Sequence, residues 1–211
     1  MKVAVFNGSP NREGNTYHAL TMVTDELNRE GIETEIIHVG NKVIRGCTAC
    51  GGCAKNKNEQ CVITGDEVNG WVQNMKTADG IILGSPVHYA AMSGTMKSFL
   101  DRAFYVSGVN DGLLRHKVGA SVVAVRRSGG LPTFEQLNNF MMYAEMLIPT
   151  SNYWNVIHGR SPGEVTQDIE GVQIMRVLGK NMAWLMKLVE NGTGTVTPPE
   201  REPKTFMSFI H

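Results

Sequence analysis

Several features are missing from this sequence of 211 residues. No apolar segment approaches the roughly 18–20 residues that a membrane-spanning helix needs. The formal net charge is zero, from 20 Lys and Arg against 20 Asp and Glu, so no overall field would draw the chain to nucleic acid or to an anionic membrane. The N-terminus lacks the basic stretch and long apolar core of a signal peptide, so the sequence predicts a cytoplasmic location. The patterns G-x-x-x-x-G-K-[ST] and G-x-G-x-x-G are absent too, which argues against a nucleotide hydrolase and a tight dinucleotide site.

Cysteine is scarce, and its distribution excludes a disulfide scaffold. All four cysteines lie between Cys47 and Cys61, whereas a scaffold would spread its bridges along the chain, and a cytosolic setting disfavours disulfides. The spacing is C-x2-C-x2-C-x7-C, with glycines that let a short loop wrap thiolates around a cubane iron–sulfur cluster. Four thiolates can also bind zinc, and free or redox-active thiols are a third interpretation. The candidate metal ligands are Cys47, Cys50, Cys53 and Cys61.

Apolar, β-branched runs alternate along the chain with segments of helical periodicity. The runs predict strands over 2–6, 33–39, 80–84, 118–125 and 155–158. The periodic segments predict helices over 16–30, 66–76, 92–105, 133–147 and 167–190. This order predicts one three-layer α/β domain over 1–192, with helices on both faces of a parallel sheet. Residues 193–211 form a tail that ends in Phe206, Met207, Phe209 and Ile210, which we expect to pack on the domain or on a partner subunit.

Ligands of such sheets bind beyond the carboxyl ends of the strands, so the loops after the first, third and fourth runs are informative. The first loop, NGSPNREGNT at 7–16, leads into a helix N-terminus, whose unpaired N–H groups suit a phosphate. Its polar side chains add further donors, and one adds a full positive charge. The loop therefore predicts a phosphate site with Ser9, Arg12, Asn15 and Thr16.

The second loop contains residues that could lie flat against a planar ring, and the third loop contains glycines that let a ligand approach the backbone. After 80–84, Pro86, Val87, His88 and Tyr89 would make a flat wall for a planar ring, although His88 alone is more typical of a surface residue. The loop at 124–133 contains Gly129 and Gly130, which permit a ligand to approach the backbone. It also carries Arg126 and Arg127, either as solvated side chains or as positive charge at a ligand. Asp101 and Arg102, at the end of the helix predicted over 92–105, are expected to be structural.

Taken together, these motifs resemble one protein family. G-S-P-x-x-x-G-N-T at 8–16, S-P-V-x5-S-G-x2-K-x-F-x-D-R at 85–102 and R-V-L-G-K-N-M-A-W at 176–184 are similar to the NADPH-dependent FMN reductases of the flavodoxin-like fold. The resemblance implies FMN, strand order 2-1-3-4-5 and a homodimer or higher homo-oligomer. It implies that the FMN phosphate lies at Ser9, Arg12, Asn15 and Thr16. It places the isoalloxazine ring beside Pro86, Val87, His88 and Tyr89, with its pyrimidine edge near Ser128, Gly129 and Gly130.

A flavin carries the hydride chemistry itself, so no catalytic acid, base or nucleophile is required. Arg126 or Arg127 would stabilise the negative charge that reduction places near N1 of the ring. The neutral composition and the basic loops favour an enzyme that passes hydride from NAD(P)H to a flavin, quinone or similar acceptor. No motif distinguishes NADH from NADPH.

Two other functions are compatible with the cysteine run, which is similar to that of iron–sulfur flavoproteins. One is an electron carrier that relays single electrons between FMN, a [4Fe-4S] cluster and ferredoxin-like partners. The other is a flavin-dependent sensor in which cysteine oxidation is the signal.

Overall fold

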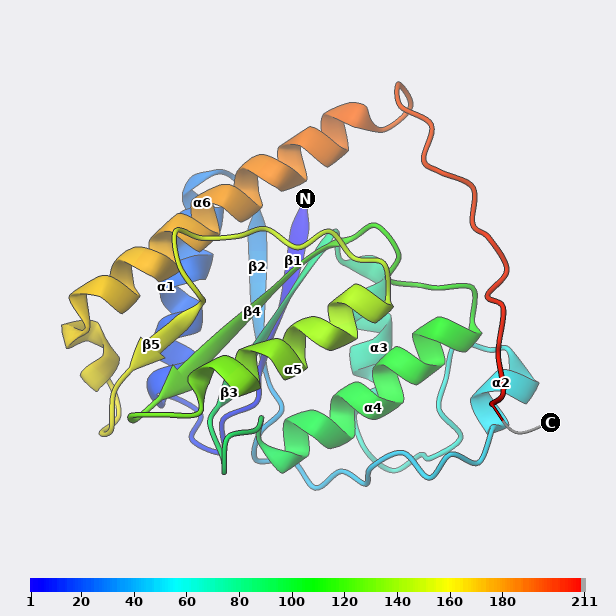
Figure 1. Ribbon diagram of the computed structural model, residues 1–211, viewed down its shortest axis with the longest axis horizontal. Coiled ribbons are helices and arrows are strands. Elements are labelled where there is room, and N and C mark those ends of the chain that lie inside the picture. Colours follow the sequence, from blue (N-terminus) through cyan, green and yellow to red (C-terminus); the bar gives the residue numbers. More distant parts are fainter. Residues whose placement is uncertain (210–211) are drawn as a thin grey trace.

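A sheet of five parallel strands forms the centre of the protein, and the computed structural model describes residues 1–209 (Figure 1). The strand order is β2-β1-β3-β4-β5, which confirms the predicted order 2-1-3-4-5. Nearly every residue of β1, β3 and β4 is buried, as their continuous apolar runs predict for strands covered on both faces. The strands are β1 (Lys2–Asn7), β2 (Glu33–His38), β3 (Gly80–Pro86), β4 (Val118–Val125) and β5 (Val156–His158).

Helices cover both faces of this sheet, as the alternating pattern predicts (Figure 1). On one face lie α1 (Asn15–Arg29) and α6 (Ile169–Gly192), whose apolar stripes pack against each other and against the sheet. On the other face lie α3 (Val68–Thr77), α4 (Gly94–Val109) and α5 (Gly130–Tyr143). Two short elements were not predicted: α2 (Gly52–Asn56) and the 3-10 turn η1 (Glu164–Gln167).

Two predicted helix boundaries are wrong. Helix α4 begins after Ser93, whose hydroxyl accepts a hydrogen bond from the Met96 N–H at 3.4 Å, and it continues to Val109. Asp101 and Arg102 therefore lie within the helix and not at its end. Helix α5 ends at Tyr143. Leu147 lies beyond it and is exposed, and its backbone forms hydrogen bonds of 2.9 Å each with Lys117 and Gly119 at the start of β4.

The connection from β2 to α3, residues 39–67, is long and mostly irregular, and it carries all four cysteines. Long connections without regular structure are uncommon in compact domains and are usually functional or disordered. This connection runs along α4, and α2 lies near the C-terminal end of that helix (Figure 1).

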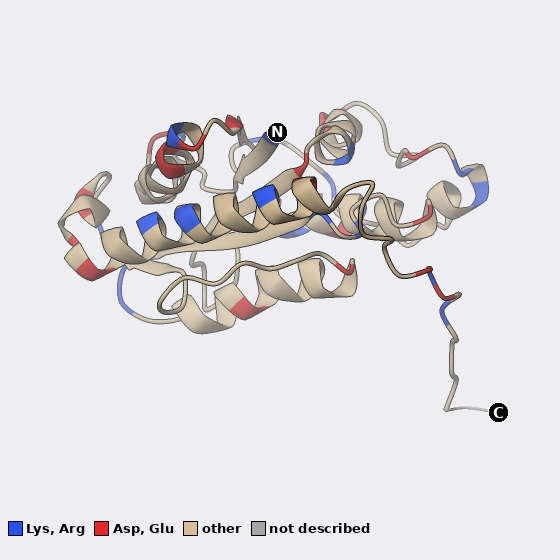
Figure 2. Ribbon diagram, turned by 90° about the horizontal axis from the view of Figure 1, so that it is seen from above, with Lys and Arg blue, Asp and Glu red and all other residues tan. Residues whose placement is uncertain are grey.

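The surface carries both signs of charge, and Figure 2 shows Lys and Arg interspersed with Asp and Glu over the helices. Among residues 1–209, no helix has the length and apolar composition to cross a membrane.

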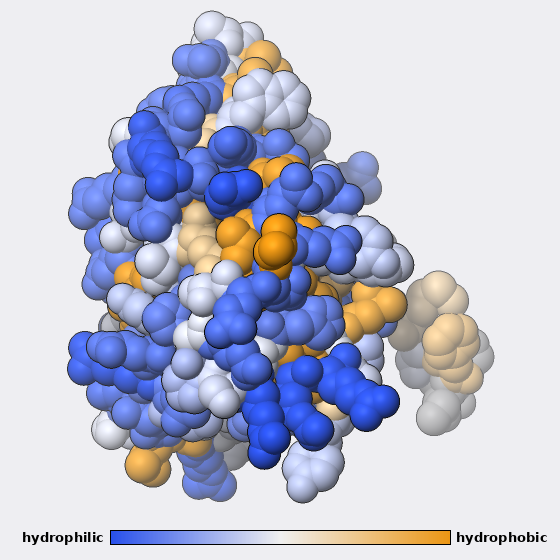
Figure 3. Space-filling view, turned by 90° about the vertical axis from the view of Figure 1, so that its left-hand side faces the viewer, coloured by the Kyte–Doolittle hydropathy of each residue, from blue (hydrophilic) through white to orange (hydrophobic). Residues whose placement is uncertain are grey.

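The C-terminal segment after α6 runs along one side of the domain, past α4 (Figure 1). The Arg115 guanidinium donates to the Pro199 carbonyl at 3.1 Å, and the Lys204 ammonium lies 3.9 Å from the centre of the Tyr143 ring. Beyond these contacts, Phe206, Met207 and Phe209 are exposed, and Figure 3 shows apolar atoms standing clear of the body there. Packing of this tail on the domain or on a partner subunit stays a prediction, and Ile210 lies outside the described residues.

Candidate functional site

The carboxyl ends of β1, β3, β4 and β5 enclose a cavity of about 150 Å³. It brings together residues of all three loops that the sequence singled out, and it adds the loop after β5, which sequence reasoning missed. The strand before that loop was predicted over 155–158, but the loop itself was not singled out. The lining residues are Ser9, Asn11, Gly14, Asn15, Thr16, Pro86, Val87, Ala124, Arg126, Gly159, Arg160 and Pro162.

The first loop is held in shape from within by Asn7, the last residue of β1. The Asn7 side chain accepts from the Ser9 N–H and donates to the Arg12 carbonyl, both at 3.0 Å. The Ser9 hydroxyl accepts from the Asn11 N–H at 3.2 Å, and His38 Nε2 donates to the Ser9 carbonyl at 2.8 Å. The shape of the loop is therefore fixed by hydrogen bonds within the chain itself.

Thr16, in the first turn of α1, has an unpartnered hydroxyl. Its residue is 1% exposed, and its Oγ1 is the only buried side-chain polar atom among the described residues that lacks a hydrogen-bond partner. No side chain caps the N-terminus of α1, so the N–H groups of its first turn also lack a capping acceptor. Buried polar groups are almost always paired, and a cluster of free donors at a helix N-terminus suits a phosphate.

A second cavity of about 270 Å³ lies between the loop after β4 and the start of α6. Gly129 has a φ of +88°, and a Cβ at this position would lie 3.0 Å from the Ala90 Cα, so the third loop lies against the second. Exposed aromatic residues that sequence reasoning missed, Tyr153 and Trp154, also line this cavity. The remaining lining residues are Arg127, Ser128, Gly129, Gly130, Leu131, Val156, His158, Asp168, Glu170, Gly171 and Ile174.

The predicted flavin-site residues are thus divided between the two cavities. Ser9, Asn15, Thr16, Pro86, Val87 and Arg126 line the first, and Arg127, Ser128, Gly129 and Gly130 line the second. Their roles stay predictions.

Three predicted site residues line neither cavity. Arg12 is exposed, as are His88 and Tyr89. The backbones of His88 and Ala91 exchange hydrogen bonds of 2.8 and 3.0 Å, and the two residues between them have positive φ. This tight turn points the Tyr89 side chain into solvent. A ring-stacking role for Tyr89 also stays a prediction.

The four cysteines line one small cavity beside α4, together with Arg102. Cys53 and Cys61 are buried, whereas Cys47 and Cys50 are exposed. Among the described residues, no three or more His, Cys, Asp or Glu side chains lie close enough together to hold a single metal ion. Tetrahedral zinc requires its sulfurs to converge on one point, whereas a cubane cluster binds each thiolate through a different iron. Four thiols on one cavity are the donor set that a [4Fe-4S] cluster uses, so the residues present fit such a cluster.

The surroundings of these thiols differ. The Gly52 N–H and the Thr48 side chain lower the pKa of the Cys50 thiol below its ordinary value. Burial raises the pKa of the Cys53 thiol, because it disfavours the thiolate. The cavity thus presents thiols of different acidity.

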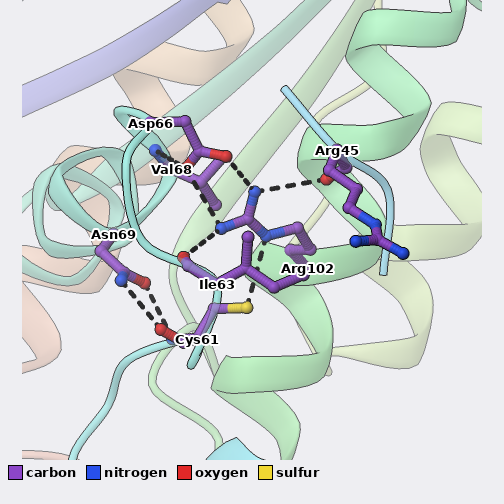
Figure 4. A network of polar contacts seen from close by, with 7 residues as sticks. All are labelled: Arg45, Cys61, Ile63, Asp66, Val68, Asn69 and Arg102. Atoms are coloured by element: carbon purple, nitrogen blue, oxygen red, sulfur yellow. Dashed lines mark hydrogen bonds and ion pairs between the residues drawn. The ribbon is translucent and has the colours of Figure 1, made fainter. Parts of the chain in front are cut away.

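Arg102 is the central residue of a buried polar network around Cys61 (Figure 4). Its side chain is 0% exposed and forms an ion pair with Asp66, with Nη1 at 2.5 Å and Nη2 at 3.1 Å from the carboxylate oxygens. Nη1 also donates to the Arg45 carbonyl at 3.2 Å, Nη2 to the Ile63 carbonyl at 2.8 Å, and Nε to the Cys61 Sγ at 3.3 Å. Burial disfavours the charged guanidinium, but the bonds to Asp66 and Cys61 outweigh it and raise the pKa of Arg102.

Comparison with known proteins identifies the family. Residues 1–160 match the NADPH-dependent FMN reductases. The chain belongs to this family. It is 36% identical over 198 residues to an iron-sulfur flavoprotein of Methanocaldococcus jannaschii, covering 90% of this chain and 100% of that protein. It is 26% identical over 192 residues to an iron-sulfur flavoprotein of Methanosarcina thermophila, covering 90% of this chain and 97% of that protein.

Solved structures share the fold at low sequence identity. RosB, solved with a bound riboflavin-5'-phosphate derivative, superposes with a TM-score of 0.69 at 14% identity, covering 100% of this chain and 98% of RosB. A WrbA-like flavodoxin from Agrobacterium tumefaciens has a TM-score of 0.59 at 16% identity, covering 89% of this chain and 97% of that one. Family and fold together make this FMN reductase family member a flavoprotein oxidoreductase.

Proposed function

We propose that this flavoprotein takes electrons from NAD(P)H through FMN bound at the carboxyl edge of the sheet, and passes them to a flavin, quinone or similar small acceptor. The unpartnered Thr16 hydroxyl carries the proposal. A buried donor at an uncapped helix N-terminus lacks an acceptor in this chain, and the phosphate of FMN supplies one.

The chain's own residues would bind and orient the cofactor. Ser9, Asn15 and Thr16, with the first-turn N–H groups of α1, would hold the phosphate, and Arg126 and Arg160 would balance its charge from the opposite loops. Pro86 and Val87 would lie against the ring. The bound FMN supplies the hydride chemistry, and no side chain is assigned as acid, base or nucleophile.

The second cavity would hold the pyrimidine edge of the ring at Ser128, Gly129 and Gly130. Arg127 lines this cavity, and its positive charge would favour the reduced, anionic ring. Alanine at this position is expected to lower the two-electron potential of bound FMN. An unchanged two-electron potential of bound FMN would exclude this role for Arg127.

Anaerobic titration of the FMN-loaded chain with NADPH, and separately with NADH, tests the proposal. The expected result is loss of the flavin absorbance with one equivalent of nucleotide, followed by recovery when a quinone or free FMN is added. A flavin that stays oxidised with both nucleotides would exclude a pyridine-nucleotide donor. Failure to take up FMN at micromolar concentration would exclude the cofactor site.

The cysteine cavity favours a second candidate function, that of an electron carrier. A [4Fe-4S] cluster bound by Cys47, Cys50, Cys53 and Cys61 would relay single electrons between FMN and a ferredoxin-like partner. Four thiols on one cavity support this, as do the iron-sulfur flavoproteins among the relatives. Iron and sulfide analysis of anaerobically prepared chain tests it, with about four of each expected per chain. Absence of both after anaerobic reconstitution would exclude the cluster.

A homodimer or higher homo-oligomer is also proposed, because the outer side of α6 exposes Trp184 and Leu188. Sedimentation equilibrium tests this, and a monomer at micromolar concentration would contradict it.

A further inference from the structure

Among residues 1–209, Arg102 is the largest side chain that is fully buried, and its burial requires an explanation. An arginine removed from water loses its hydration, and a carboxylate partner often only balances that loss. Two of the five N–H groups of Arg102 donate to the Asp66 carboxylate, and two more donate to the carbonyls of Arg45 and Ile63. The fifth donor, Nε–H, is directed at the Cys61 sulfur. All five donors are therefore used, and one of them is used on a thiol of the cysteine cavity.

Cys61 is also held through its backbone. The Asn69 side chain accepts from the Cys61 N–H at 2.8 Å and donates to the Cys61 carbonyl at 2.9 Å (Figure 4). Asn69 belongs to α3 and Arg102 to α4, so two helices fix this residue from two sides. Cys47 and Cys50 lie at the surface in irregular chain. Cys61 is therefore held by more elements of the fold than Cys47 and Cys50 are.

We propose that Arg102 is a positioning residue for the cysteine site: it fixes the Cys61 sulfur and, through its Nε–H, makes reduction of the bound iron–sulfur cluster more favourable. This inference rests on the proposed cluster. Reduction adds negative charge that the ligating sulfurs share, and hydrogen bonds to those sulfurs are one of the factors that set cluster potentials. A donor on a cationic group strengthens as the acceptor gains charge. The bond therefore stabilises the reduced form more than the oxidised form and raises the potential.

The test compares cluster potentials in the full chain, loaded with FMN and reconstituted anaerobically with iron and sulfide. The main variant is Arg102→Gln combined with Asp66→Asn, because removal of the arginine alone would leave Asp66 buried and unpaired. Reductive titration follows the cluster by electron paramagnetic resonance and the flavin by absorbance. We expect the redox equilibrium of the cluster to shift about tenfold toward the oxidised form, which is about 59 mV for one electron.

Two controls separate this effect from loss of charge or loss of fold. Arg45→Gln removes an equal charge from a residue that joins the network only through its carbonyl. The exposed Arg45 side chain points away from Cys61, so the cluster potential should stay at the wild-type value (Figure 4). The flavin is an internal reference, because Arg102 lines neither FMN cavity, and its potential should also stay unchanged. Should the double variant lose FMN as well as iron, Arg102→Lys replaces it. This variant keeps the charge beside Asp66 and lacks the Nε–H, so we expect the same direction of shift.

Each outcome decides between the two proposals. Wild-type cluster potentials in variants that retain iron would overturn the role of Arg102 and leave the cluster proposal intact. A parallel shift of the flavin and cluster potentials would also overturn it, because a general loosening of the fold would then explain both. A wild-type chain that takes up no iron would overturn the cluster proposal and this inference with it.

Discussion

The proposed FMN cradle and the cysteine segment are built by different means. The cradle, defined as the cavity that Ser9, Thr16 and Arg160 help to line, consists of loops that follow directly from strands and the first turn of a helix. The topology of the sheet brings these loops together. The cysteine segment, residues 45–63, has only the short α2 as regular structure and relies on side-chain bonds to α3 and α4. A site at a sheet edge thus depends on topology, and a site in a long connection depends on individual polar contacts.

Helix α4 is common to both regions. At its start, the Ser93 hydroxyl donates to the Gly8 carbonyl of the first loop at 2.6 Å. Further along, Arg102 contacts Cys61, and at its end the Val109 carbonyl accepts from the Lys57 ammonium. Since a helix rises about 1.5 Å per residue, Ser93 and Arg102 are separated by roughly 13 Å along its axis. The two regions share a support and are otherwise separate.

The strongest test of this separation is Cys61→Ser. We expect complete loss of bound iron, because serine is a poor cluster ligand, while FMN binding stays at the wild-type level. The fold should persist, since a serine hydroxyl can accept from Arg102 and the Asn69 bonds are to the backbone. Iron analysis and FMN stoichiometry on one sample measure both effects, with Val62→Ala as the neighbouring control that keeps its iron. Loss of FMN together with iron would show that the regions are not independent.

Thr16→Val tests the cradle alone. The hydroxyl has no partner in the chain, so its removal should leave the stability of the FMN-free protein unchanged or slightly raised, while the FMN dissociation constant rises about tenfold. Thr24→Val on the same helix is the matched control, because the Thr24 hydroxyl donates to the Thr21 carbonyl at 3.1 Å. That control should cost about 1 kcal/mol of unfolding free energy and leave FMN affinity unchanged. Flavin fluorescence titration and urea unfolding measure the two quantities, and equal FMN affinities for Thr16→Val and wild type would contradict the phosphate assignment.

Charge at the cradle is expected to have a smaller effect. The combined Arg126→Gln and Arg160→Gln variant should bind FMN several-fold more weakly and riboflavin equally well, because only FMN carries the phosphate. Added salt should shrink the difference, since both side chains are exposed. Arg127→Gln, at the other cavity, is the control and should not change the ratio of the two affinities.

The smallest expected effect concerns Asp168, which caps α6 beside the second cavity. Partial burial opposes ionisation, but the N–H groups of Gly171 and His158, at 2.9 and 2.7 Å, outweigh it and hold the pKa of Asp168 below its ordinary 3.8. A lowered pKa stabilises the fold above 3.8, and this contribution is lost as the pH falls through the folded-state pKa. Asp168→Asn should therefore cost about 0.5 kcal/mol at neutral pH, since asparagine still caps the helix. Urea unfolding at neutral and strongly acidic pH measures this, and a cost that persists in acid would contradict the assignment.

The fold was predicted almost completely, because hydrophobic periodicity is a local property that marks strands and helices, and the family resemblance implied the strand order. The buried runs at 80–84 and 118–125 became β3 and β4 with little change at their ends. The loop at 7–16 was also singled out, from glycine and polar side chains before a helix, and its phosphate role stays a prediction. The errors arose where tertiary contacts override local signals. Helix α4 continues past Tyr105 because Val106 and Ser107 are buried, and Leu147 leaves α5 to pair with the edge of β4.

The sequence by itself determined the α/β architecture, the placement of three loops at the carboxyl edge of the sheet, and the presence of four cysteines within one short segment. Only the tertiary structure decided that Thr16 has a free buried hydroxyl, that the loop after β5 completes the cradle, and that Arg102 reaches Cys61. The physical reason is distance along the chain: Arg102 and Cys61 are 41 positions apart, and a contact of that kind leaves no periodic pattern in the sequence.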